Sequence, residues 1–76
     1  MSNEVCQLDL AGLRCPMPIL KTKQKLQSLP KGAQLRVIAT DPHAEIDFKA
    51  YLARSEHKLI SFNDYDERFE FLIEKG

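Results

Sequence analysis

The sequence predicts an α/β (α+β) two-layer sandwich, in which two helices cover one face of a four-stranded mixed sheet. Four segments have the composition and period of strands, and two have the period of amphipathic helices. They follow one another in the order βαβαββ, and two helices on one face of a single sheet would bury every apolar stripe. We expect a single domain with a small hydrophobic core, spanning residues 1–76.

The first strand and the first helix lie on either side of a proline-rich run. Residues 5–10 alternate between apolar and polar side chains, which is the period of a half-buried strand. After the prolines, apolar side chains recur at spacings of three and four and predict an amphipathic helix with a basic outer face. That apolar face holds Ile19, Thr22, Leu26 and Leu29. Residues 30–32, Pro-Lys-Gly, are expected to end the helix.

The next pair of elements is a central strand and a second helix. Residues 35–40 are apolar and rich in β-branched side chains, as in a buried strand. Asp41 and Pro42 then open a helix, because an aspartate carboxylate caps the N-terminus and proline suits the first helical position. The helix is expected to run to about Ser55, and one of its faces holds Ala44, Phe48, Tyr51, Leu52 and Ser55.

Two further strands complete the predicted sheet. They are expected at residues 57–62 and 68–73, and the polar residues 63–66 between them have the composition of a turn. In the last strand, Phe69, Phe71 and Ile73 alternate with charged side chains. The alternation predicts that these three pack under the helices.

Composition narrows the classes of partner. The formal net charge is zero, but residues 1–40 carry six Lys and Arg against two acids, and residues 41–76 carry five against nine. This asymmetry would steer a charged partner to one face. The sequence pI of about 6.7 lies far below the pI above about 9 of nucleic-acid-binding domains. We therefore expect no direct binding of nucleic acid.

The sequence predicts a cytoplasmic protein and a monomer. Residues 1–4 show no basic or apolar leader, and no apolar run reaches the roughly 18 residues of a membrane span. Two cysteines without a leader favour a reducing, cytoplasmic setting. No sequence feature predicts self-association, so we expect a monomer that docks transiently and no contact with a membrane.

Cys15 is the residue best suited to chemistry. It lies within residues 12–18, GLRCPMP, between the first strand and the first helix. Prolines are tolerated in a first helical turn, so the run marks a helix start at which the thiol is displayed. A helix N-terminus and nearby cations lower a thiol pKa, and Arg14 and Lys21 are the candidate cations.

The prolines of the run favour rigid presentation of the thiol over its activation. Pro16 and Pro18 lack the amides that would otherwise donate to the sulfur at a helix start. We therefore expect them to hold Cys15 outward. Met17, between them, is expected to face an incoming partner.

Motifs along nearly the whole chain resemble those of the TusA/SirA-type sulfur carriers. They are Leu8-Asp9, Gly12-Leu13-Arg14-Cys15-Pro16-x-Pro18, Leu35, Val37, Asp41-Pro42, Asp47, His57-x-Leu59 and Ile73-x-Lys75. The resemblance implies a sulfur carrier or sulfurtransferase in which Cys15 accepts sulfane sulfur as a persulfide from a cysteine desulfurase. It implies relay of that sulfur to a downstream acceptor protein, without a metal or an organic cofactor. Some relatives feed tRNA 2-thiouridine synthesis and commonly carry Glu where this chain has Met17.

Other classes of function stay open. One is a non-catalytic regulatory module that binds protein or RNA through the basic helix or the open face of the sheet. Another is a thiol redox protein using Cys6 and Cys15, although Cys6 is in register with the apolar side of its strand and fits a core residue better.

A metal site is not expected, because the cysteines and histidines lack the spacing of known ligand sets. The basic side chains Lys21, Lys23, Lys25 and Lys31 fit a solvated helix face, and the alternative is a binding surface that guides a partner with an acidic rim to Cys15.

Overall fold

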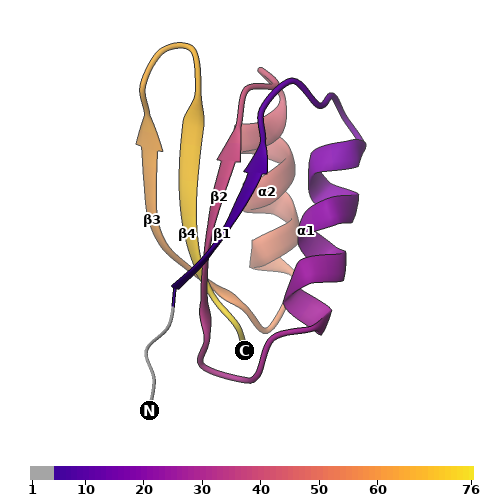
Figure 1. Ribbon diagram of the computed structural model, residues 1–76, viewed down its shortest axis with the longest axis vertical. Coiled ribbons are helices and arrows are strands. Elements are labelled where there is room, and N and C mark those ends of the chain that lie inside the picture. The colour runs from indigo at the N-terminus through magenta and orange to yellow at the C-terminus, as the bar shows by residue number, and fades with distance from the viewer. Residues whose placement is uncertain (1–4) are drawn as a thin grey trace.

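The computed structural model describes residues 5–76 and confirms the predicted fold class. The elements are β1 (Val5–Leu10), α1 (Met17–Gln27), β2 (Gln34–Ala39), α2 (Ala44–Ala53), β3 (Lys58–Asp64) and β4 (Phe69–Glu74). Both helices lie against the same face of one sheet (Figure 1). Residues 1–4, on which the expectation of no leader rests, lie outside the described residues. Within residues 5–76, no helix has the length and apolar character that crossing a membrane requires.

The topology of the sheet brings two connections together. The strand order is β1-β2-β4-β3, with β1 parallel to β2 and both other pairs antiparallel. Because parallel strands end at the same edge of a sheet, the β1–α1 and β2–α2 connections emerge at one edge (Figure 1). Residues far apart in the sequence therefore meet there.

The core lies between the helices and the sheet. Phe48 of α2 stacks on Phe71 of β4, with ring centroids 4.4 Å apart, and both rings are fully buried. Phe71 and Ile73 are buried and Phe69 is half-buried, which confirms that this side of β4 packs under the helices. The remaining buried apolar residues are Leu10, Leu26, Leu35, Val37, Ala39, Ala44 and Leu52.

The second helix begins later than predicted. It starts at Ala44 instead of Pro42, and it ends at Ala53 instead of about Ser55. The reason is that Asp41 C=O accepts the Ala44 N–H at 2.9 Å and closes a turn around Pro42. The first helical i to i+4 bond runs from the Asp47 N–H to the C=O of His43. The predicted cap is therefore wrong: His43 is the N-cap residue and no side chain caps the helix, whereas the Asp41 carboxylate accepts the His43 N–H in the preceding turn.

The last hairpin reverses later than predicted. Residues 63 and 64, predicted as turn, extend β3 because they pair with Glu70 and Phe69 in the ladder. The chain reverses between Tyr65 and Arg68, where the Tyr65 N–H donates to the Arg68 carbonyl at 2.9 Å. The predicted bounds of β2 and β4 differ from those of the structure by one residue at each end.

Candidate functional site

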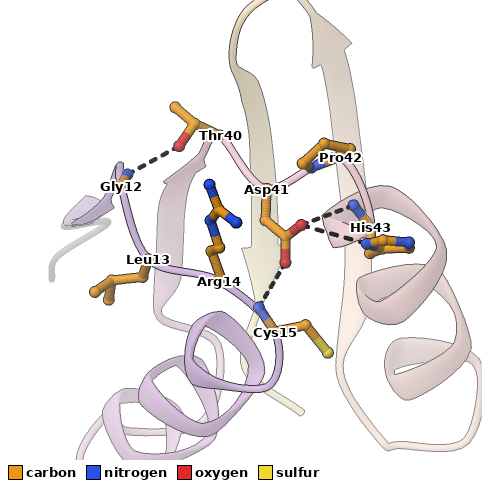
Figure 2. Close-up of a pocket in the computed structure, with 8 residues that line it drawn as sticks. All are labelled: Gly12, Leu13, Arg14, Cys15, Thr40, Asp41, Pro42 and His43. Carbon is orange, nitrogen blue, oxygen red and sulfur yellow. Dashed lines mark hydrogen bonds and ion pairs between the residues drawn. The ribbon is translucent and has the colours of Figure 1, made fainter.

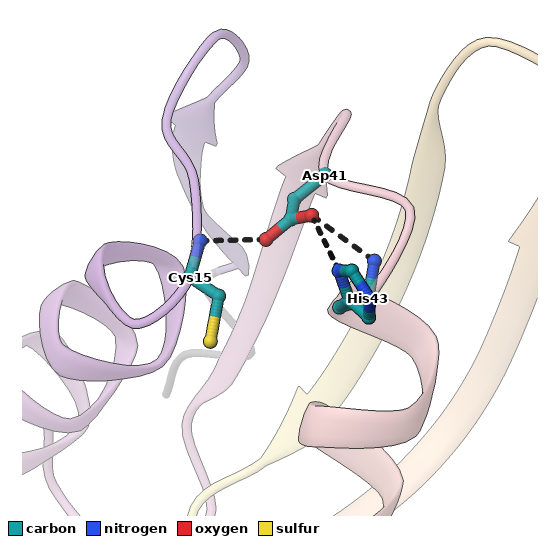
Figure 3. A network of polar contacts seen from close by, with 3 residues as sticks. All are labelled: Cys15, Asp41 and His43. Carbon is teal, nitrogen blue, oxygen red and sulfur yellow. Dashed lines mark hydrogen bonds and ion pairs between the residues drawn. The ribbon is translucent and has the colours of Figure 1, made fainter.

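Cys15 lies on the β1–α1 connection, immediately before the first helix. The helix begins at Met17 with Pro16 as its N-cap, so the thiol stands just outside the first turn. Cys15 is exposed, which confirms the prediction of a displayed thiol. Its backbone N–H donates to Asp41 Oδ2 at 2.6 Å (Figure 3).

Asp41 joins the two connections at this edge of the sheet. The residue is only 6% exposed, and its second oxygen, Oδ1, accepts the His43 N–H at 3.0 Å. The His43 ring adds a contact of 3.5 Å from Nδ1 to the same oxygen. The bond from the His43 N–H, followed by that from the Cys15 N–H, lowers the pKa of the Asp41 carboxyl below its ordinary value, against the effect of burial. An ionised, buried carboxylate therefore fixes the backbone of Cys15.

A cleft of about 590 Å³ opens on one side of Cys15. Figure 2 shows it between the two connections, and it is lined by Gly12, Leu13, Arg14, Cys15, Thr40, Asp41, Pro42 and His43. Gly12 has a φ of 86°, a conformation that glycine adopts without strain, and its N–H donates to Thr40 Oγ1 at 2.8 Å. This second bond between the connections keeps the walls of the cleft together.

A groove of about 430 Å³ opens on the other side of Cys15, between the two helices. The sulfur points away from the Asp41 carboxylate and into the space between α1 and α2 (Figure 3). The groove is lined by Cys15, Pro16, Ile19, Lys23, Asp47, Ala50, Tyr51 and Arg54. Cys15 thus stands where the cleft and the groove meet, so reactants can approach it from either.

The predicted lowering of the Cys15 pKa is wrong. A hydrogen bond to Asp47 raises the pKa of the thiol above its ordinary value, and partial desolvation and the charges of Asp47 and Asp41 act in the same direction. Sequence reasoning placed cations near the sulfur, whereas the fold places two carboxylates there. The free protein therefore holds Cys15 as a thiol at neutral pH.

Replacing Asp47 by asparagine is expected to lower the Cys15 pKa. The substitution removes a negative charge and replaces a charged hydrogen-bond acceptor, the largest cause of the raised pKa, by a neutral one. The midpoint of the pH–rate profile for alkylation by iodoacetamide should move to lower pH, and alkylation at pH 7 should become faster. The control is Glu45→Gln on the same helix, where the carboxylate pairs with Lys49 at 2.7 Å. An unmoved midpoint in Asp47→Asn, or an equal shift in both variants, would contradict this assignment.

The other predicted site residues fall into two groups. Arg14 lines the cleft and Pro16 lines the groove, so both lie beside Cys15. Met17 and Lys21 are exposed on α1, but they line neither the cleft nor the groove. Pro18 is buried. The sequence predicts no role in the groove for Arg54, and it indicates Asp47 only as one of the family motifs. The helical spacing of Asp47 and Arg54, seven residues apart on one face, is the signal that indicates them.

Cys6 lies at the far end of β1 from Cys15. It is half-buried and packs against the core, which confirms its prediction as a core residue. At about 3.3 Å per residue, four residues of strand put Cys6 roughly 13 Å before Leu10, whereas Cys15 follows the end of the strand. Both thiols are free. A disulfide needs Cα atoms within about 7 Å, so this arrangement does not favour a redox pair.

Comparison with known proteins identifies the family. Residues 6–75 match the family model described as sulfurtransferase TusA. The chain belongs to the TusA family. This confirms the resemblance that the sequence motifs carried.

Relatives within the TusA family match over most of their own length. The sulfur carrier protein TusA of Allochromatium vinosum is 41% identical over 70 residues, which cover 92% of each chain. The putative sulfur carrier protein YrkI of Bacillus subtilis is 41% identical over 69 residues, or 91% of this chain and 92% of the relative. A putative sulfur carrier protein of Neisseria meningitidis serogroup A is 37% identical over 67 residues, or 88% and 90%. Membership of the TusA family supports a role as a sulfur carrier.

Proposed function

We propose that this protein carries sulfane sulfur as a persulfide on Cys15, between a cysteine desulfurase and a downstream acceptor protein. The observation that carries the proposal is the exposed thiol at the meeting point of the cleft and the groove, in a chain of the TusA family. Asp41 supports the role by fixing the Cys15 backbone at 2.6 Å. The two free cysteines fit a reducing compartment, and we place the reaction in the cytoplasm.

The proposed cycle has two exchange steps. In loading, the Cys15 thiol loses its proton to water and attacks the outer sulfur of the desulfurase persulfide, the sulfur–sulfur bond breaks, and the donor cysteine leaves as a thiolate that takes up a proton. In unloading, an acceptor thiolate attacks the outer sulfur on Cys15, which leaves in turn. A raised pKa makes Cys15 a stronger nucleophile once deprotonated but a poorer leaving group. The resting site therefore favours retention of the sulfur until an acceptor docks.

The residues around the thiol take supporting roles in this proposal. Arg14 lies in the cleft, where its guanidinium can meet an anionic group of a partner. Pro16 and Pro18 stiffen the backbone on which Cys15 stands. Met17 and Lys21 are exposed on α1 and face the docked partner. As the destination of the sulfur we propose 2-thiouridine in tRNA, reached through the acceptor protein without direct binding of tRNA by this chain.

Loading by a desulfurase is the decisive experiment. Incubation of the protein with a cysteine desulfurase and cysteine, followed by intact-mass measurement, should show one added sulfur that a reductant removes. Cys15→Ser should show no added sulfur, because it lacks the accepting thiol. Cys6→Ser is the matched control and should load like the wild type, since Cys6 packs against the core. Loading of Cys15→Ser, or no loading of the wild type by several desulfurases, would overturn the proposal.

A further inference from the structure

The groove between α1 and α2 has the dimensions and chemistry of a small-ligand site. Its volume of about 430 Å³ falls within the roughly 300–1,000 Å³ of small-molecule pockets. Pro16, Ile19 and Ala50 supply apolar lining, and Cys15 stands at one end. A ligand lying in the groove would therefore bring its reactive atom to the thiol.

Two cations in the groove lack a carboxylate partner. Among residues 5–76, the ion pairs join His43 to Asp41, Lys49 to Glu45 and Arg68 to Glu70, so none of them uses Lys23 or Arg54. The Lys23 ammonium instead lies 5.1 Å from the centre of the Tyr51 ring, which holds the charge over the groove. Such a pair of cations is complementary to a carboxylate.

The spacing along the helices sets the length of the ligand. Asp47 lies beside the Cys15 thiol and Arg54 is seven residues further along α2, which is roughly 10 Å at 1.5 Å per residue. Cysteine persulfide carries its carboxylate carbon only four bonds from the outer sulfur that is attacked, and it is too short to span this distance. A short cysteinyl peptide spans it, and its N–H groups are donors that the Asp47 carboxylate can accept.

We propose that the groove binds a short peptide persulfide with a free carboxylate, which loads Cys15 without a protein donor. The inference rests on the proposed function, because it assumes that Cys15 carries sulfane sulfur. The Cys15 thiol loses its proton to water, the resulting thiolate attacks the outer sulfur of the peptide persulfide, and a new sulfur–sulfur bond forms on Cys15. The peptide's own sulfur–sulfur bond breaks, and the peptide leaves as a thiolate that takes a proton from water. No external oxidant or reductant enters this exchange.

The test uses glutathione persulfide as the peptide probe and cysteine persulfide as the short probe. The initial rate of sulfur uptake is measured by intact mass over a range of probe concentrations. Uptake from glutathione persulfide should saturate, and at low concentration it should exceed uptake from cysteine persulfide. In the double variant Lys23→Glu with Arg54→Glu, uptake from glutathione persulfide should fall about tenfold or more, because two attractions become two repulsions.

A charge-matched double variant separates the groove from net charge. Arg36→Glu with Lys58→Glu changes two exposed cations on β2 and β3 that do not line the groove, and uptake should stay within about twofold of the wild type. Alkylation by neutral iodoacetamide and thermal unfolding check that the thiol and the fold are unchanged. If the Lys23→Glu, Arg54→Glu variant unfolds, the double variant Lys23→Gln with Arg54→Gln replaces it. The expected fall in uptake from glutathione persulfide is then smaller, because the charges are removed and not reversed.

The outcomes separate this inference from the proposed function. Equal uptake from the two probes, or equal rates in the two double variants, would overturn the small-ligand site while loading by a desulfurase stands. A groove variant that loses loading by a desulfurase but keeps uptake from glutathione persulfide would assign the groove to a protein donor and overturn the inference too. Absence of a Cys15 persulfide with every donor would overturn both proposals.

Discussion

Replacement of Phe71 by alanine should lower the free energy of unfolding by about 3 to 5 kcal/mol. The ring is fully buried at the centre of the layer between helices and sheet, stacked on Phe48 at 4.4 Å and tilted against Phe62 at 5.1 Å. Its removal leaves a cavity that two rigid aromatic neighbours cannot fill. Small domains have only about 5 to 15 kcal/mol of total stability, so the variant should be partly unfolded near 37 °C.

Phe69→Ala is the matched control for this prediction. Phe69 lies on the same face of the same strand, but it is only half-buried and its ring is 6.0 Å from that of Phe62. Its loss should cost less than half as much, because water already reaches part of the ring. Urea unfolding followed by far-ultraviolet circular dichroism measures both variants. Equal costs for the two would show that the stack on Phe48 does not hold the layers together.

Periodicity in the sequence was sufficient to predict the layers of the fold. Strict alternation along β4 put Phe71 and Ile73 on the helix side, and the spacing of Ala44, Phe48 and Leu52 put α2 over them. Boundaries were predicted less well, because local hydrogen bonds decide them. Asn63 is a common turn residue, yet its pairing with Glu70 keeps it in the ladder.

The site was predictable only in part, since its chemistry depends on contacts between elements. The Cys15 run indicated a displayed thiol without any tertiary information. The bond from its N–H to Asp41 spans 26 residues and requires that β1 and β2 be parallel. The carboxylate of Asp47 reaches the thiol only because α2 packs beside α1. The cations close to Cys15 along the chain can be identified from the sequence. The approach of the Asp47 carboxylate from α2 depends on tertiary packing, so the sequence does not predict it.

Replacement of Asp41 by alanine should lower the free energy of unfolding at pH 7 by roughly 2 to 4 kcal/mol, because two hydrogen bonds to its carboxylate are lost. The substitution removes two part-buried hydrogen bonds, from the N–H groups of Cys15 and His43, and a hydrogen bond to a charged acceptor contributes about 1.5 to 3 kcal/mol, or less where water reaches the donor. It also frees the Cys15 backbone, so loading with sulfur should slow in parallel. The control is Asp9→Ala, which removes an exposed carboxylate that accepts the Ala11 N–H at 3.0 Å. Water can replace that bond, so its loss should cost about 1 kcal/mol or less.

The difference between the wild type and Asp41→Ala should depend on pH with a definite sign. The Asp41 pKa in the folded protein is lower than its ordinary value of 3.8, so the ionised carboxylate contributes stability that is fully present above that value. As pH falls through the folded pKa, the carboxylate is protonated and that contribution disappears. Urea unfolding from pH 7 toward about pH 2 should therefore show the two stabilities converging. A difference that does not change over this range, or one no larger than that of Asp9→Ala, would mean that Asp41 does not anchor the Cys15 connection.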